Sequence, residues 1–180
     1  DIIDAVAQAY HDSGMRARLA LDQPELSELE KLPFLRDVLP DDLRLKLSTP
    51  TGTPAPQLLE SYTHLIGRWH GAEDGRIKAA VSCSAPQRGS PDYFVQLDDL
   101  SLRHDLPFYA HMLETRLQRV YGDVCLNGRS LVQYTHELGL LSDRMNVIHA
   151  IWVDDSDLDL LAASGAVVAH NPNSNLRLGS

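Results

Sequence analysis

The sequence lacks several features that would assign it to a common class of protein. No apolar run approaches the roughly 20 residues of a membrane span, and no signal-peptide pattern opens the chain. No cluster of basic residues occurs, and 16 Lys and Arg against 25 Asp and Glu give a net charge of -9. That balance argues against a nucleic-acid-binding surface. The two cysteines, Cys83 and Cys125, lie too far apart for a redox or zinc pair motif. We therefore expect a cytoplasmic protein with reduced thiols that binds neither membrane nor nucleic acid.

What the sequence does contain is an alternation of helical and strand-like patterns. A first helix begins at residue 2 and ends at its C-cap, Gly14. Apolar runs predict strands at 15–21, 77–83, 107–113, 146–152 and 166–170. Apolar spacing and capping residues predict further helices at 58–69, 91–104, 129–138 and 154–165. Residues 23–56 contain six prolines, which predicts an irregular excursion with a helical turn or two.

Strands separated by helices imply parallel pairing through right-handed crossovers. A doubly wound sheet could hold five such strands, although no glycine-rich phosphate loop follows any of them. A (β/α)8 TIM barrel needs about 250 residues, so this chain would be an internal segment of one. The pattern alone leaves both architectures open.

Polar residues at the ends of three successive predicted strands favour the barrel. His111 ends one strand and is followed three residues later by Glu114, His149 lies in the next strand, and His170 opens an Asn-rich stretch after the last. The carboxyl ends of parallel strands open on one face of an α/β fold, where active sites lie. We therefore expect these side chains to converge at one mouth.

Such a set suits metal-assisted hydrolysis. Neutral imidazole is a good zinc ligand, and a bound divalent metal lowers the pKa of its water to about 7. A nearby glutamate can take a proton from that water and pass it to a leaving amine. A second histidine can stabilise charge on the substrate without binding the metal.

Three motifs carry a resemblance to a known family. They are His111-Met112-Leu113-Glu114-Thr115, Val147-Ile148-His149-Ala150, and the segment from Val168 through His170-Asn171-Pro172-Asn173-Ser174-Asn175 to Ser180. Together they strongly resemble the amidohydrolase superfamily, in its branch of cytosine, guanine and methylthioadenosine deaminases and triazine hydrolases. The resemblance covers residues 75–180 well and the remainder by pattern only.

The resemblance implies a role for each matching residue. His111, at the end of the fifth barrel strand, matches the family's metal-binding histidine, and Glu114 matches its proton-shuttling glutamate. His149, on the sixth strand, matches the histidine that contacts substrate or nucleophile. Asn173 and Asn175 resemble a turn that lines the pocket floor, which implies substrate binding. The implied cofactor is a divalent metal, zinc with iron as the alternative, and the implied substrate is a small N-heterocycle.

The sequence also departs from the family pattern. The family's first strand ends in His-x-His, which occurs nowhere here, and the family's eighth strand ends in a metal-binding aspartate. We therefore expect residues 1–180 to be a partial barrel domain, covering about strands 3 to 7, that binds no catalytic metal alone. Open strand edges would pair with further strands or with another copy in a homo-oligomer. The excursion at 23–56 is expected to help select the substrate, as long insertions in barrels often do.

These patterns support one main function and two alternatives. The main function is hydrolytic deamination, or dechlorination, of an N-heterocycle by a metal-activated water. The alternatives are a cyclic-amide hydrolase of the same superfamily and a non-catalytic barrel fragment. Residues outside the motifs are interpreted as structural: His170 through hydrogen bonds, the helical histidines as surface or packing residues, and the pairs Asp98-Asp99 and Asp154-Asp155 as solvated helix charges.

Overall fold

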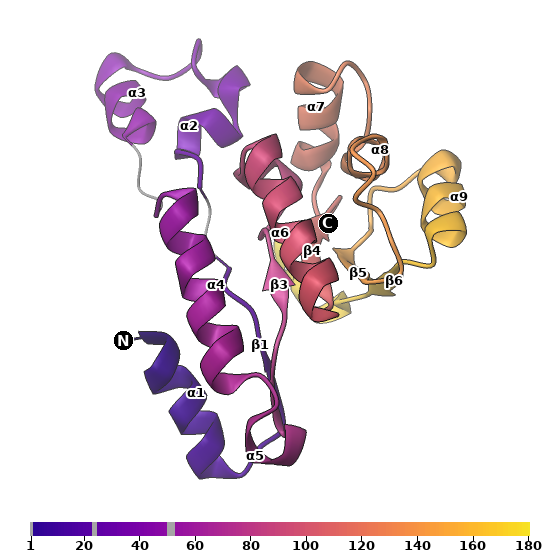
Figure 1. Cartoon of the computed structure of the whole chain (residues 1–180). Coiled ribbons are helices and arrows are strands. Elements are labelled where there is room, and N and C mark those ends of the chain that lie inside the picture. The colour runs from indigo at the N-terminus through magenta and orange to yellow at the C-terminus, as the bar shows by residue number, and fades with distance from the viewer. Residues whose placement is uncertain (1, 23–24, 50–52) are drawn as a thin grey trace.

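The parallel strands of the molecule run in chain order. The computed structural model describes residues 2–22, 25–49 and 53–180 (Figure 1). Its strands are β1 (Ala17–Leu19), β2 (Ile77–Ala79), β3 (Val81–Ser82), β4 (Phe108–Met112), β5 (Met145–His149) and β6 (Val167–Ala169). β1 pairs with β2, and β3, β4, β5 and β6 pair in that order, all in parallel. The five predicted strand regions are therefore confirmed, with narrower limits.

The predicted strand at 77–83 is divided, and the division joins the two sheets. Only Ala80 separates β2 from β3, and its N–H donates to the Leu19 carbonyl at 2.8 Å. The first half of this strand thus pairs with β1 and the second half with β4. The result is a continuous arc in the order β1, β2/β3, β4, β5, β6. A doubly wound sheet reverses its strand order at a switch point, and the described strands show no such reversal.

The hydroxyl of Tyr62 closes the gap where β1 and β3 separate. It accepts from the N–H groups of Ser82 (2.9 Å) and Leu21 (3.2 Å) and lies within donating distance of both carbonyls. Tyr62 is fully buried. One side chain therefore satisfies backbone groups that the strand ladder leaves without partners, as buried backbone groups require.

Helices cover one side of this arc. α1 and α4 lie side by side next to β1 and β2, while α6 lies over β3 and β4 (Figure 1). The helices are α1 (Ile2–Ser13), α2 (Glu28–Lys31), α3 (Asp41–Ser48), α4 (Ala55–Trp69), α5 (Ala72–Gly75), α6 (Pro91–His104), α7 (Arg116–Cys125), α8 (Leu131–Glu137), α9 (Asp155–Ser164) and α10 (Pro172–Leu178). The predicted helices at 58–69, 91–104, 129–138 and 154–165 are confirmed within a few residues. The excursion holds α2, a 3-10 turn and α3, while Pro24 and Pro50 lie outside the described residues.

Two predictions of local structure are wrong, and one helix was not predicted. The segment Asn171–Asn175 is not a turn, because α10 begins at Pro172 and runs to Leu178. The strand predicted at 146–152 ends at His149, where the backbone becomes left-handed. Residues 116–125 form α7, which the sequence analysis left unassigned although Leu117, Val120, Tyr121 and Val124 recur at helical spacing.

Capping residues explain where several of the helices begin. Ser90 caps α6 by accepting from the Tyr93 N–H, and Pro91 follows at the first helical position. Ser130 and Asp154 begin α8 and α9 with complete capping boxes. Each of these caps satisfies N–H groups that the helix itself leaves free.

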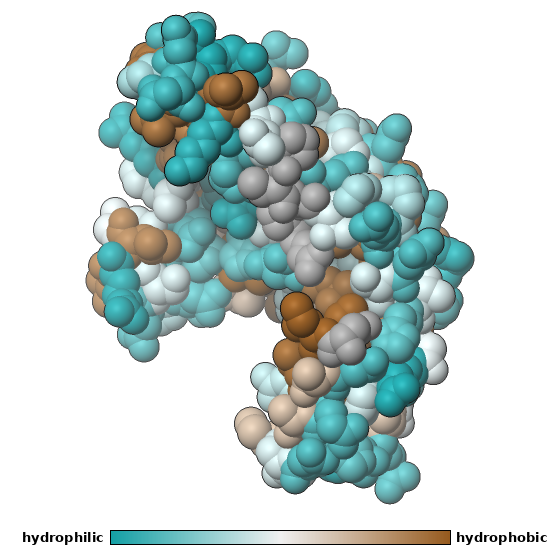
Figure 2. Space-filling view, turned by 90° about the vertical axis from the view of Figure 1, so that its left-hand side faces the viewer, coloured by the Kyte–Doolittle hydropathy of each residue, from teal (hydrophilic) through white to brown (hydrophobic). Residues whose placement is uncertain are grey.

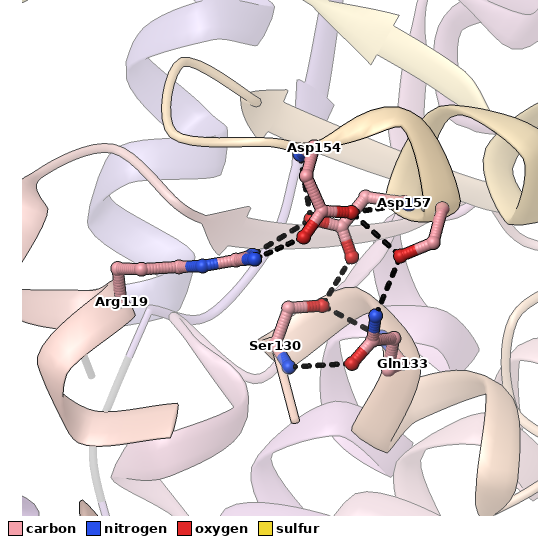
Figure 3. A network of polar contacts seen from close by, with 6 residues as sticks. Arg119, Ser130, Gln133, Asp154 and Asp157 are labelled. Carbon is pink, nitrogen blue, oxygen red and sulfur yellow. Dashed lines mark hydrogen bonds and ion pairs between the residues drawn. The ribbon is translucent and has the colours of Figure 1, made fainter. Parts of the chain in front are cut away.

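A polar network ties α7, α8 and α9 together beside the strand ends (Figure 3). The fully buried Asp157 carboxylate accepts from the Arg119 guanidinium at 2.9 Å, from the Ser130 hydroxyl and from the Asp154 N–H at 3.1 Å. Arg119 also pairs with Asp154. Asp154 is therefore a paired cap residue and not the solvated charge that the sequence suggested. Asp98 departs in the same way, because it pairs with Arg144 at 2.9 Å and is only 14% exposed.

The apolar core lies between the helices and one face of the strands. In β4, Phe108, Ala110 and Met112 are buried, whereas Tyr109 and His111 are partly exposed on the opposite face. Phe108 packs edge-on against Phe94 of α6, with ring centroids 5.5 Å apart. The alternation thus directs apolar side chains to the helices and His111 to the inner side of the arc.

Some apolar surface remains exposed near the N-terminal helix. Figure 2 shows brown apolar side chains gathered in the lower half of that view, where α1 lies. Ile2 is 84% and Met15 56% exposed. At the other end of the arc, Val167 of β6 is 53% exposed. None of the described helices is long and apolar enough to span a membrane.

Candidate active site

The structure brings together His111, Glu114 and His149 at the carboxyl ends of β4 and β5. The ring centroids of the two histidines lie 5.5 Å apart. Glu114 Oε1 lies 3.0 Å from His149 Nε2. Their convergence at one mouth is what the strand-end argument predicts.

The strand register alone would not bring the two histidines together. His111 lies opposite Ile148, and His149 lies opposite Met112, so the alternation assigns the two rings to opposite faces. His149 has a φ of 80° and Ala150 a φ of 49°, which ends the alternation at this point. The His149 ring therefore faces His111 although the strand register assigns it to the opposite face, and the backbone at this point is left-handed.

A second left-handed residue lies on the neighbouring strand end. Leu113, between Met112 and Glu114, has a φ of 54°. Such a conformation costs roughly 1–2 kcal/mol for a residue other than glycine. The Leu113 carbonyl accepts from the N–H groups of Ile151 (3.1 Å) and Trp152 (2.9 Å), which holds the two turns against each other. Strained backbone that neighbouring contacts enforce is typical of functional sites.

His111 is oriented as a metal ligand would be. Its Nδ1 lies 2.6 Å from the Ser84 carbonyl oxygen, and a carbonyl can only accept, so Nδ1 carries the proton. In the neutral ring the lone pair is then on Nε2. Metal-binding histidines commonly donate their other ring N–H to a backbone carbonyl in this way. The residue therefore fits a divalent metal through Nε2.

His149 has a different environment, because both of its ring nitrogens have partners. Nε2 faces Glu114, and Nδ1 lies 3.2 Å from the side-chain oxygen of Asn175. The ring is only 4% exposed. In this arrangement Nε2 can donate a hydrogen bond to substrate in place of its contact with Glu114. The arrangement does not suit a metal ligand, because neither ring nitrogen is free.

A pocket of about 410 Å3 opens over the two histidines. Asn173 and its neighbours at the start of α10 line it. Asn175, in contrast, is 4% exposed and lies behind His149, where its Nδ2 has no hydrogen-bond partner among the residues that the structure describes. Of the two asparagines predicted to bind substrate, Asn173 therefore reaches the pocket and Asn175 contacts His149. His170 is exposed at the end of β6 and does not line this pocket.

Sequence reasoning missed two features of the site. Gln118, in the first turn of α7, accepts from the Glu114 N–H at 2.6 Å and reaches the His111 carbonyl at 3.4 Å. A second pocket, of about 240 Å3, is lined by Glu114 together with Lys31 of α2 and Arg88. The helical spacing of 116–125 was available as a signal for α7, but no sequence signal joins α2 to Glu114.

Within the described residues, no group of three or more His, Cys, Asp or Glu side chains could hold a metal ion. His111, the predicted ligand, therefore has no set of companion ligands among the described residues. The other histidines lie elsewhere; Nε2 of His11 and Nε2 of His64, for example, each lie 2.9 Å from a carboxylate oxygen, of Glu73 and Asp4 respectively. Cys83 and Cys125 are both free thiols.

Comparison with known proteins identifies relatives of this chain. No family model matches the chain. A 5-methylthioadenosine/S-adenosylhomocysteine deaminase of Nitratidesulfovibrio vulgaris is 35% identical over 133 residues, which are 72% of this chain and 30% of that protein. A 5'-deoxyadenosine deaminase of Methanothermobacter thermautotrophicus is 28% identical over 178 residues, 99% of this chain and 36% of that protein.

Among solved structures, the atrazine chlorohydrolase of Arthrobacter aurescens, complexed with zinc, has a similar fold. It superimposes with a TM-score of 0.79 at 24% identity, over 98% of this chain and 36% of that one. The chain thus spans about a third of the length of the relatives that it matches. The predicted resemblance to deaminases and triazine hydrolases is confirmed.

Proposed function

Since the chain is a homologue of deaminases of the amidohydrolase superfamily, we propose that it carries half of the active site of a metal-dependent hydrolase. The reaction is hydrolytic removal of an amino or chloro group from an N-heterocycle. An aminated purine, as in the names of the relatives, is the first substrate to test. Residues 1–180 form a partial barrel domain that corresponds to about strands 3 to 7. The observation that carries the proposal is the convergence of His111, Glu114 and His149 at one mouth.

The metal in this proposal is zinc, with iron as the alternative. The solved relative complexed with zinc supports the choice, as does the fixed Nδ1 proton of His111. A divalent metal at this position would polarise a water molecule and lower its pKa to about 7. His111 Nε2 would be one ligand, and the remaining ligands would come from outside the described residues.

The side chains of this chain perform the proton transfers. Glu114 accepts a proton from the attacking water and donates it to the leaving amine, as a positioned carboxylate can. His149 Nε2 points toward Glu114 and can donate to the substrate atom on which charge develops. Asn173, on the pocket wall, contacts the heterocycle. Asn175 holds the far side of the His149 ring and thereby serves substrate binding indirectly.

The excursion before α4 contributes to substrate choice. Lys31 and Glu28 of α2 form an ion pair at 2.5 Å on the wall of the pocket that Glu114 also lines. The substituent of the heterocycle that lies farthest from the reacting carbon would occupy this pocket. We also propose that the protein is a homo-oligomer and that it is located in the cytoplasm. The two free thiols support the cytoplasmic location.

Two substitutions in the complete protein separate the proposed roles. Glu114→Gln keeps the shape of the side chain and removes the base, so kcat should fall by about 10²-fold or more while the metal stays bound. His111→Ala should lower metal content together with activity. Metal analysis and steady-state kinetics on aminated purines, pyrimidines and triazines measure both. Equal metal loss in the two variants would show that the roles are assigned wrongly, and an inactive wild-type protein across the panel would refute the function.

A further inference from the structure

The start of α7 differs from those of α2, α8 and α9, which begin with capping boxes. In α2, α8 and α9 the third helical residue (Glu30, Gln133 and Asp157) accepts from the backbone N–H of the N-cap residue. In α7 that position is Gln118, and the N-cap residue is Thr115. The Gln118 side chain passes over Thr115 and accepts instead from the N–H of Glu114.

The contact is short, and the surrounding polypeptide shields it from water. The distance from Glu114 N to Gln118 Oε1 is 2.6 Å, and Gln118 is 9% exposed. The other end of the amide, Nε2, lies 3.4 Å from the His111 carbonyl. One side chain therefore spans the turn from the proposed metal ligand to the proposed proton shuttle.

The turn that Gln118 spans has an unfavourable backbone. Leu113, at its centre, is left-handed and fully buried. The Leu113 carbonyl is already held by Ile151 and Trp152, whereas among the described residues the Glu114 N–H has the Gln118 oxygen as its acceptor. Without that acceptor the residue after Leu113 can rotate, and the Glu114 carboxylate would leave its position 3.0 Å from His149.

We propose that Gln118 is a positioning residue that fixes the Glu114 carboxylate against His149 through the Glu114 backbone N–H. This inference rests on the proposed function, in which Glu114 moves the proton. Gln118 does not contact the metal or the reacting carbon in that scheme, although it also lines the second pocket beside Glu114. It acts on the direction of the carboxylate and therefore on the proton-transfer step.

Gln118→Met is the main test, because methionine keeps the length of the side chain and removes the amide. In the complete zinc-loaded protein, kcat should fall by about 10- to 100-fold, the range expected when a catalytic group is displaced by about 1 Å. KM can also rise, because Gln118 lines the second pocket, so kcat at saturating substrate is the deciding value. Zinc content should be unchanged, because the Ser84 carbonyl holds both the N–H and the ring of His111. Gln118→Glu keeps the acceptor for the Glu114 N–H and should retain at least about threefold more kcat than Gln118→Met.

Gln133→Met provides a matched control. Gln133 is the same residue type at the same helical position of α8, and its Oε1 accepts from the Ser130 N–H at 3.0 Å. The substitution removes an equivalent capping contact away from the site and should leave kcat unchanged. Equal kcat values for Gln118→Met and Gln133→Met would overturn the proposal, as would equal values for Gln118→Met and Gln118→Glu. Loss of zinc in parallel with kcat would also overturn it.

A measurement without substrate separates this inference from the proposed function. Hydrogen exchange at the Glu114 amide should accelerate in Gln118→Met and stay slow in Gln133→Met. If wild type turns over no substrate, the proposed function fails, whatever the exchange rates are. If wild type is active and the Glu114 amide exchanges equally fast in all three proteins, only the role of Gln118 is refuted.

Discussion

Asp157 of α9 is a position at which a single substitution should strongly destabilise the fold. The carboxylate is fully buried and joins three helices, since it accepts from Arg119, from the Ser130 hydroxyl and from the Asp154 N–H. Asp157→Ala removes the acceptor of all three donors at once (Figure 3).

The magnitude follows from the donors that remain. Ser130 is fully buried, so its hydroxyl loses its acceptor at a cost of about 1–3 kcal/mol, and the Asp154 N–H adds a similar term. Arg119 contributes less, because its side chain is 27% exposed and keeps its pairing with Asp154. We expect a total loss of about 3–4 kcal/mol in the free energy of unfolding, within the range for a broken buried ion pair.

Urea unfolding followed by circular dichroism measures this loss. With a slope of roughly 2 kcal/mol per M, the midpoint should fall by about 1.5–2 M. Asp157→Asn keeps an acceptor oxygen and should lose about half as much. Asp155→Ala, on an exposed residue of the same first turn, is the control and should change stability by less than about 1 kcal/mol. A midpoint shift below about 0.5 M for Asp157→Ala would refute the claim that this network holds the three helices together.

Two further predictions test the fold and its dependence on pH. Tyr62→Phe leaves the backbone groups of Ser82 and Leu21 without their hydroxyl partner. The free energy of unfolding, measured by thermal unfolding, should fall by about 2–4 kcal/mol. A fall below about 0.5 kcal/mol would contradict the bridging role. The Ser156 hydroxyl, the Asp157 N–H and Arg119 lower the pKa of Asp154 from 3.8 to about 2. A carboxyl group whose pKa is lower in the folded than in the unfolded protein stabilises the fold at pH values above the unfolded-state pKa. For Asp154 this contribution disappears as the pH falls from about 4 to about 2. Asp154→Asn should therefore lose less stability over that interval than wild type in acid titrations, and an identical loss would show that Asp154 does not contribute.

The sequence alone determined the alternation of elements and the main chemical groups of the site. Apolar period and cap residues are local properties, so the strand regions and the helices at 58–69, 91–104, 129–138 and 154–165 followed from neighbouring residues. The spacing of His111 and Glu114 after a strand, with His149 on the next, was likewise readable. The Asn171–Asn175 helix was missed because its asparagines favour turns, although Pro172 at the first helical position was a signal for a helix.

The tertiary structure decided how those groups face one another. Strand alternation assigns His111 and His149 to opposite faces of the sheet. Their rings nevertheless lie close together, at the point where the backbone of His149 is left-handed. The contact from Gln118 back to Glu114 depends on α7 folding over the Leu113 turn, and the contact of Asn175 with His149 spans 26 positions. Local propensity disfavours a positive φ at leucine and histidine. Such conformations exist here because contacts between distant segments enforce them, and sequence patterns that describe neighbours do not contain that information.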